Sequence, residues 1–142
     1  MSKNCIFCRI SSKEAQASTV YEDEKVMAFL SHRPVNVGHT LVIPKKHYEN
    51  IYSIPEDEAA YLFRIVRRVT HAVRDAVCPE GMRIVQNNGA IGGQVVFHLH
   101  VHIIPMKPHN VTHDSIYRDH THERSPQDLE ADAQKIKLQM EK

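Results

Sequence analysis

The stretch Val95–Ile104 reads VVFHLHVHII and is the longest β-like run in the sequence. It is rich in β-branched residues, and in its second half histidines alternate with aliphatic side chains. Successive side chains of a strand point to opposite faces, so His98, His100 and His102 are predicted to share one face. Neighbouring side chains on one face lie about 6.6 to 6.8 Å apart, so a single small anionic ligand could contact all three imidazoles.

Imidazoles in this arrangement suit chemistry on a phosphate. A neutral imidazole can attack phosphorus if an acceptor holds its other ring nitrogen and donors surround the phosphate oxygens. Gly92 and Gly93 precede the strand and would let backbone N–H groups approach a phosphate. Asn87 and Gln94 add side-chain donors, so no catalytic metal is required. Two alternatives stay open: a catalytic metal held by a His-x-His pair of the strand plus a third imidazole, and a row of surface histidines on the wet face of a half-buried strand.

The segments around this stretch predict one central helix among strands. After Pro55, apolar residues recur every three or four positions as far as Val77, which indicates an amphipathic helix of about six turns. A helical turn is expected over Cys5–Ile10, and a last helix over Leu129–Met140, with Ser125 as its N-cap and Pro126 in its first position. Four further segments have strand-like sequences: Val20–Glu22, Lys25–Leu30, Thr40–Ile43 and Met82–Val85. We therefore predict an α+β fold with an antiparallel sheet of about five strands packed with a central amphipathic helix.

Two polar segments are expected to face solvent. The central helix carries arginines on its polar side, at positions 64, 67, 68 and 74. The stretch Met106–Arg124 is polar and has no regular spacing of metal ligands, although it contains His109, His113, His120 and His122. It is expected to be a solvated loop.

Length and composition limit the function classes. A chain of 142 residues predicts a single domain over 1–142, with a core at about 5–105 and a polar tail and C-terminal helix over 106–142. The formal net charge is +1, and the sequence has no dense Lys/Arg block, so polymeric nucleic acid is not an expected partner. The sequence has neither an apolar signal segment at its start nor an apolar run of about 18 residues, so no membrane association and a cytoplasmic location are expected.

The three cysteines do not suggest a disulfide framework. Cys5 and Cys8 form a Cys-x-x-Cys motif, which in a reducing compartment indicates metal or redox chemistry. Cys78 is expected to be a thiol of the core.

The segment His98–Ile104 resembles the His-φ-His-φ-His-φ-φ motif of the histidine triad (HIT) family, in which φ is an apolar residue. Two more segments, Leu41–His47 and Asn87–Gln94, are similar to those of the Hint branch, the nucleoside phosphoramidases, and the Cys-Ile-Phe-Cys start occurs in bacterial relatives. The resemblance covers roughly residues 5–105. It implies a homodimer with a shared sheet and an enzyme that cleaves at the α-phosphate of purine nucleotide conjugates, of the adenosine phosphoramidate type.

The resemblance also implies roles for individual residues. His100 would be the nucleophile that becomes transiently nucleotidylated, and His102 would contact the phosphate and help to protonate the leaving group. The nucleotide-binding residues would be Phe29 and Ser31 near the nucleoside, and Asn87, Gly93, Gln94 and Val95 near the phosphate and leaving group. Two of these depart from the family pattern: Ser31 stands where an acidic residue usually takes the ribose hydroxyls, and Val95 stands where a Ser or Thr usually donates to the leaving group.

A metal site is expected from a second set of residues. Relatives that bind zinc have ligands at the positions of Cys5, Cys8, His47 and His98, and two thiolates with two imidazoles make a closed tetrahedral site, which is structural rather than catalytic. The alternative is a pair of buried thiols without zinc. His39 is either a buried structural histidine or a partner of a site residue. The other functions to be weighed are a dinucleoside polyphosphate hydrolase, a nucleotide-binding or scaffold protein with little turnover, and a metal-dependent hydrolase.

Overall fold

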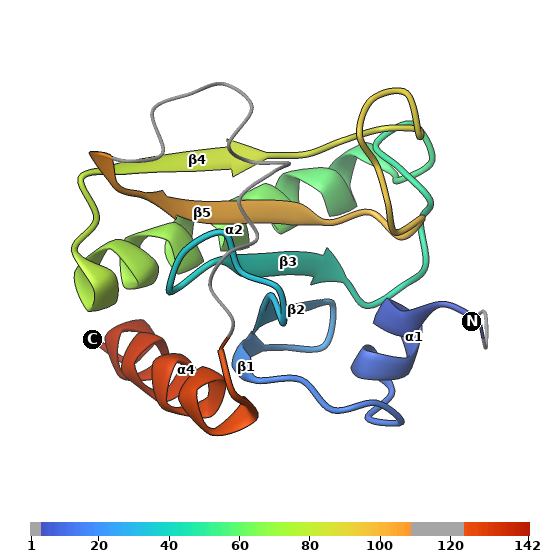
Figure 1. The fold of residues 1–142 in the computed structure, drawn as a ribbon. Coiled ribbons are helices and arrows are strands. Elements are labelled where there is room, and N and C mark those ends of the chain that lie inside the picture. The colour runs from blue at the N-terminus through green and yellow to red at the C-terminus, as the bar shows by residue number, and fades with distance from the viewer. Residues whose placement is uncertain (1–3, 109–123) are drawn as a thin grey trace.

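The computed structural model describes residues 4–108 and 124–142 and shows one antiparallel five-stranded sheet (Figure 1). The strand order is β1-β2-β3-β5-β4, and every neighbouring pair is antiparallel. The strands are β1 (Thr19–Glu22), β2 (Val26–Leu30), β3 (Thr40–Pro44), β4 (Gly81–Val85) and β5 (Val101–Met106). The predicted α+β class and the antiparallel sheet of five strands are confirmed.

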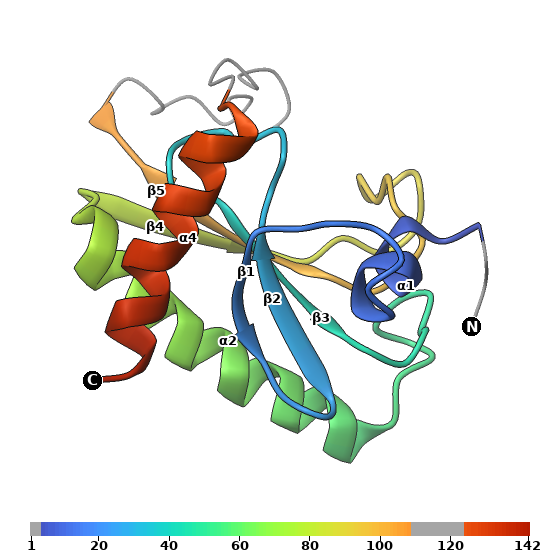
Figure 2. The same cartoon turned by 90° about the horizontal axis from the view of Figure 1, so that it is seen from below.

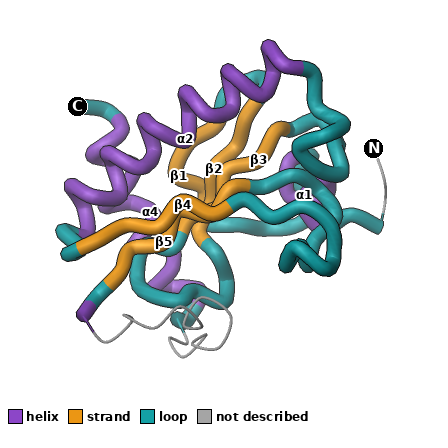
Figure 3. Tube along the Cα trace, turned by 90° about the horizontal axis from the view of Figure 1, so that it is seen from above, coloured by secondary structure: helices purple, strands orange, loops and turns teal. Residues whose placement is uncertain are grey.

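Helices cover both faces of the sheet (Figures 2 and 3). The long helix α2 (Glu56–Val77) runs across one face, and α4 (Pro126–Met140) packs beside it, with residues of both helices in one apolar cluster. The short helix α1 (Ile6–Ser11) packs on the opposite face. Ser125 caps α4 as predicted, because its side chain accepts a hydrogen bond from the Asp128 N–H at 3.0 Å. Among the described residues, no helix has the length and apolar composition needed to cross a bilayer.

The strand alternation divides the apolar residues into two cores. Val26, Ala28 and Leu30 of β2 face α2, together with Val101 and Ile103 of β5. On the other face, Met27 and Phe29 of β2 and Leu41 and Ile43 of β3 pack against Phe7 and Ile10 of α1. The histidines at positions 100 and 102 alternate with residues of the first core, so they lie on the face that α1 covers.

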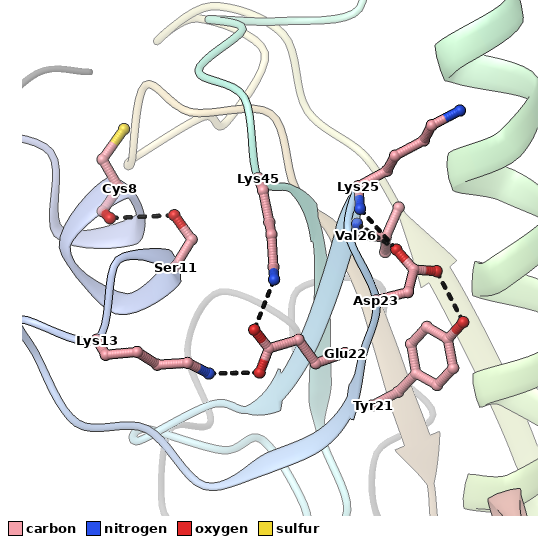
Figure 4. A network of polar contacts seen from close by, with 9 residues as sticks. All are labelled: Cys8, Ser11, Lys13, Tyr21, Glu22, Asp23, Lys25, Val26 and Lys45. Carbon is pink, nitrogen blue, oxygen red and sulfur yellow. Dashed lines mark hydrogen bonds and ion pairs between the residues drawn. The ribbon is translucent and has the colours of Figure 1, made fainter.

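Two acidic residues fix the hairpin between β1 and β2 (Figure 4). Asp23 accepts hydrogen bonds from the backbone N–H groups of Lys25 and Val26 at 2.7 and 2.8 Å, which closes the predicted tight turn. Its other carboxylate oxygen accepts from the hydroxyl of Tyr21 at 2.7 Å. Glu22 pairs with Lys13 and Lys45, so it ties the segment after α1 to the sheet.

The structure corrects the predicted extent of the last strand. Residues from Val95 onward were expected to form a strand, but β5 begins only at Val101. The backbone N–H of Leu99 donates to the carbonyl of Tyr48 at 2.7 Å, so this part of the chain bonds to the loop after β3 instead of the sheet ladder. Two of the three histidines, His98 and His100, therefore lie in the irregular segment that leads into the strand.

Three other expectations concern helix α2, Cys78 and the histidines that follow β5. The helix extends over 22 residues, as the periodicity predicts, and its arginines at positions 64, 67, 68 and 74 are exposed. Cys78 is not a core thiol: it is exposed, and it ends α2 in a left-handed conformation with φ 52°. The histidines expected in a solvated loop, His109, His113, His120 and His122, lie outside the described residues.

Candidate functional site

The face of the sheet opposite α2 carries a row of side chains that runs across three strands. The register places Phe29 of β2 opposite Leu41 of β3, and Leu41 opposite His102 of β5. His100, which lies two residues earlier, is 7% exposed, and its ring lies 4.9 Å from that of His102 between centroids. His100 and His102 are therefore neighbours on this side of the sheet, although only His102 belongs to the strand.

The hydrogen bonds of His100 determine which nitrogen is available for chemistry. Its Nδ1 lies 2.7 Å from the carbonyl oxygen of His98, and a carbonyl can only accept, so Nδ1 carries the proton. Nε2 of the neutral ring then keeps its electron pair. Burial lowers the pKa of His100, and the hydrogen bond to the His98 carbonyl opposes this shift only in part. The ring of His100 therefore remains unprotonated to a lower pH than the ring of an exposed histidine.

His39 forms a hydrogen bond with His102, the third histidine of the motif. The backbone N–H of Val35 donates to Nδ1 of His39 at 3.1 Å, so the proton of a neutral His39 is on Nε2. That Nε2 lies 3.0 Å from Nδ1 of His102 and donates to it. His102 in its neutral form consequently carries its own proton on Nε2. Of the two roles left open for His39, the structure supports the partner of a site residue, and it is also buried.

His98 belongs to a different group of side chains. It is fully buried, and its Nε2 donates to the Pro44 carbonyl at 2.8 Å, which leaves Nδ1 unprotonated. This Nδ1 faces two sulfurs, with Cys5 Sγ at 3.3 Å and Cys8 Sγ at 3.6 Å. Burial lowers the pKa of His98 to about 4, so the ring remains a neutral base over most of the pH range.

The four expected metal ligands come together. One ligand atom from each of Cys5, Cys8, His47 and His98 can be chosen so that all lie within 4.8 Å of one another. His47 presents Nδ1 to Cys8 Sγ at 3.3 Å, and His98 presents an unprotonated Nδ1. Two sulfurs and two imidazole nitrogens match the donor sets that hold tetrahedral metal ions in proteins. The residues therefore form a possible metal-binding cluster.

The loop between β4 and the histidine segment is tightly folded around Gln94. Its side-chain oxygen accepts from the N–H of Gly89 at 2.8 Å, and its amide group donates to the carbonyls of Glu49 and Val96 at 2.6 and 3.1 Å. At Gly92, a Cβ atom would lie 2.4 Å from the carbonyl oxygen of Asn88, so only glycine fits. The Gln94 side chain is thus occupied in holding the loop, whereas the sequence suggested it as a phosphate donor.

The remaining expected site residues take different positions relative to this loop. Asn87 is half-buried, and its amide donates to the carbonyl of Gly93 at 3.4 Å. Val95 is 85% exposed and has no polar side-chain atom. Ser31 directly follows β2 and pairs with His39, which directly precedes β3: its N–H donates to the His39 carbonyl at 2.9 Å, and its hydroxyl accepts from the Arg33 N–H.

One residue of the site, Phe7, is not among the site residues expected from the sequence. Phe7 of α1 contacts the rings of Phe29, His98 and His100, with centroid distances of 5.5, 5.8 and 5.1 Å. Phe29, which was expected to flank a base, is only 3% exposed and packs against Phe7. The signal in the sequence was the position of Phe7 between the two cysteines, which ties it to any group that they hold.

Comparison with known proteins assigns the chain to a family. A family model described as "HIT domain" matches residues 12–109. "Protein hit" of Bacillus subtilis is 41% identical over 128 residues, which are 90% of this chain and 88% of that protein. "Adenylylsulfatase HINT3" of Arabidopsis thaliana is 36% identical over 107 residues, which are 75% of this chain and 54% of that protein.

Solved structures agree with this assignment over nearly the whole chain. The structure of a "hypothetical histidine triad nucleotide-binding protein" from Sulfolobus tokodaii has a TM-score of 0.85 and 41% identity, and covers 96% of this chain and 92% of that one. A "ZN-bound histidine triad family protein" from Mycobacterium smegmatis has a TM-score of 0.81 and 31% identity, over 97% and 94% of the two chains. The chain belongs to the histidine triad (HIT) family.

Proposed function

We propose that this protein is a nucleotide hydrolase or transferase that cleaves at the α-phosphate of purine nucleotide conjugates, of the adenosine phosphoramidate type, through a nucleotidyl-histidine intermediate. The observation that carries the proposal is the hydrogen bond from Nδ1 of His100 to the His98 carbonyl at 2.7 Å. It leaves a buried, neutral imidazole with its Nε2 electron pair available, as nucleophilic attack requires. The relationship to an adenylylsulfatase and to a histidine triad nucleotide-binding protein supports the same chemistry.

The reaction would take place in two steps. The Nε2 electron pair of His100 attacks the α-phosphorus, and the bond from phosphorus to the leaving nitrogen breaks. The N–H at Nε2 of His102, which His39 keeps in the donating tautomer, hydrogen-bonds to the leaving nitrogen, and this nitrogen takes a proton from solvent as it departs as the amine. Water then attacks the phosphorus, the bond to His100 breaks, and the proton that the water loses returns to solvent. The products are the nucleoside monophosphate and the free amine.

Other residues would bind the nucleotide around these two histidines. Asn87 and the backbone of Gly93 would contact phosphate oxygens, and Gln94 would contribute by fixing their loop. Phe29 and Ser31 would lie on the nucleoside side. Val95 would border the leaving group, to which it offers no donor.

We also propose that Cys5, Cys8, His47 and His98 hold a structural zinc ion. The donor set and the unprotonated Nδ1 of His98 support zinc, and the related Mycobacterium smegmatis protein is zinc-bound. Four protein ligands would leave no open position, so zinc would supply stability and take no part in the reaction. Elemental analysis of freshly purified, reduced protein should find about one zinc per chain, and a metal-free preparation would contradict this.

The open edge of β4 supports the proposed homodimer. This strand is at one end of the sheet, and Ile84 on it is 45% exposed. A second copy could pair with the edge and continue the sheet, which would also cover this apolar side chain. Free thiols at the metal site are typical of a reducing compartment, so we place the protein in the cytosol.

The proposed reaction can be tested by trapping the intermediate. Wild-type protein and His100→Ala are mixed with an adenosine phosphoramidate, quenched rapidly without acid, and analysed by intact mass. We expect an added adenylyl group and released amine for the wild type, and neither for the variant. Nucleotide binding without adduct or turnover would indicate a nucleotide-binding protein, the alternative that Val95 favours. Turnover without an adduct that a chelator abolishes, in protein that stays folded, would indicate a metal-dependent hydrolase.

The same assay with a dinucleoside polyphosphate tests the related hydrolase activity. Faster adduct formation from this substrate than from the phosphoramidate would place the protein in that branch of the family.

A further inference from the structure

The two cysteines of the metal cluster are arranged as a dithiol that can react as a pair. Cys5 precedes the first residue of α1, and its Sγ accepts a hydrogen bond from the N–H of Cys8 at 3.3 Å. Both sulfurs face Nδ1 of His98. Cys5 is partly exposed, whereas Cys8 is 2% exposed, so a small oxidant would reach Cys5 first and Cys8 would be the resolving thiol.

This dithiol is connected to the proposed nucleophile along two routes. Phe7 lies between the cysteines in the sequence, and its ring meets that of His100 edge to face, at 5.1 Å and 81°. The second route is His98. Its Nδ1 contacts both sulfurs, and its backbone carbonyl accepts a hydrogen bond from the Nδ1–H group of His100. A movement of the first turn of α1 would therefore change the surroundings of His100.

We propose that Cys5 and Cys8 form a reversible thiol switch, in which peroxide oxidation to a disulfide releases the bound metal and moves Phe7 away from His100. Hydrogen peroxide is the oxidant: it takes two electrons from the two metal-bound thiolates, its O–O bond breaks, and one S–S bond forms. The other products are two hydroxide ions and the free divalent metal. A thiol reductant reverses the reaction by thiol–disulfide exchange.

The disulfide and the metal exclude one another in this arrangement. The cluster needs two separate thiolates, each with an electron pair for the metal, whereas a disulfide sulfur is no comparable ligand. His47 and His98 alone then provide two ligands of the four. To reach bonding distance, the sulfurs must also approach one another, and the single helical turn that carries them and Phe7 must readjust. The inference rests on the proposed metal binding, but it does not require the proposed catalysis.

The experiment uses zinc-loaded Cys78→Ser protein, because Cys78 is an exposed third thiol that would react on its own. The protein is titrated with hydrogen peroxide while a metallochromic indicator measures free zinc and intact mass measures oxidation. The imidazole C–H resonances of His100 are followed by NMR. We expect one zinc released for each loss of two hydrogens, a shift of the His100 resonances as the Phe7 ring moves, and recovery of both with dithiothreitol and zinc.

Two variants separate the parts of the proposal. Cys5→Ser in the same background should form no intramolecular disulfide. Phe7→Leu should still form the disulfide and release zinc, but the His100 shift on oxidation should be much smaller, because the aromatic ring is missing. Far-UV circular dichroism confirms that each variant is folded.

Several results would overturn the switch: oxygen addition to the cysteines without a disulfide, zinc retention after the disulfide forms, or His100 resonances that do not change. None of these readouts depends on turnover. An absent adenylyl adduct would therefore refute the proposed catalysis while leaving the switch to be judged on its own measurements.

Discussion

At the scale of single residues, hydrogen-bond partners set the roles of chemically similar histidines. His98, His100 and His102 occur within five positions, yet each has a different proton arrangement because each meets a different partner: the carbonyl of Pro44, the carbonyl of His98 and the imidazole of His39. The first leaves Nδ1 for a metal, the second leaves Nε2 for attack, and the third leaves an N–H for donation.

The contact between His39 and His102 leads to a prediction for the tautomer. In His39→Ala, Nδ1 of His102 loses its donor, so the neutral ring no longer prefers a proton on Nε2. We expect kcat with an adenosine phosphoramidate to fall by roughly 10²-fold, the lower end of what loss of one positioned hydrogen-bond donor to the reacting group costs, while KM changes little. In His39→Gln, the amide can donate from nearly the same position, so it should recover much of the rate. Equal losses in both variants would contradict a role through the tautomer.

Val95 leads to a second prediction at this scale. A hydroxyl at this exposed position could donate to a leaving group, whereas the valine side chain cannot. We therefore expect Val95→Ser to increase kcat for an amine leaving group, and Val95→Ala to leave it unchanged. Both variants should unfold at the same temperature as the wild type, because the side chain is 85% exposed. A rate for Val95→Ser no higher than that of Val95→Ala would show that this position does not assist departure.

At the scale of structural elements, the site depends on loops that are fixed by side chains from elsewhere in the sequence. Gln94 joins its own loop to the segment after β3 through the Glu49 carbonyl. Asn88 makes a second connection, since its side-chain oxygen accepts from the N–H of Ile51 at 2.9 Å. These bonds give a glycine-containing loop one conformation before any ligand binds, which lowers the entropy cost of binding.

Removal of the Gln94 side chain should therefore affect both stability and nucleotide binding. Gln94→Ala leaves the Gly89 N–H and two carbonyls without their partner, at a cost of about 1 to 3 kcal/mol for each group that stays buried. We expect a lower free energy of unfolding in denaturant and a weaker affinity for a nucleoside monophosphate by calorimetry. Gln16→Ala is the matched control, since it makes the same change at an exposed position outside this loop. Unchanged affinity in Gln94→Ala would mean that the loop does not bind phosphate.

At the scale of the whole molecule, the sheet separates a structural face from a chemical one. The face toward α2 carries the larger apolar core, and the face toward α1 carries the histidines and the possible metal cluster. Burial of polar rings on this second face lowers the pKa values of His98 and His100, which makes the stability of the fold depend on pH.

The direction of this pH dependence follows from proton uptake. As pH falls below about 6.5, these two histidines take up protons in the unfolded chain, whereas His98 resists protonation in the folded chain down to a pH of about 4. The unfolded state then binds more protons, so the contribution of these histidines to stability falls as pH decreases from 6.5 to 4 and is constant above this window. His98 alone should contribute on the order of 3 kcal/mol in metal-free protein.

Denaturant unfolding of chelator-treated protein at a series of pH values measures this dependence. His98→Asn should have a smaller slope between pH 4 and 6.5, because the side chain that titrates is missing. A slope as steep as that of the wild type would assign the effect to other groups. Glu22, whose pKa is lowered chiefly by its hydrogen bond with Lys13, loses its contribution as pH falls below its unfolded value of 4.5, so it affects only the acid end of the window.

The sequence by itself determined the fold class and the participants of the site. The period of two in His98–Ile104 and the period of 3.6 after Pro55 are local consequences of backbone geometry, so they predicted a sheet, a central helix and histidines on one face. The Cys-x-x-Cys spacing and the family resemblance identified the members of the possible metal cluster, which the structure brings together.

Only the tertiary structure decided how these participants are used. The start of β5 at Val101, the pairing of His39 with His102 and the packing of Phe7 on His100 depend on contacts between residues far apart in the chain. No local period or spacing encodes them. The same holds for proton positions, because the protonated nitrogen of a histidine depends on the group that the fold places beside it. The sequence therefore predicted the three imidazoles of the motif, and the fold gave each of them its tautomer.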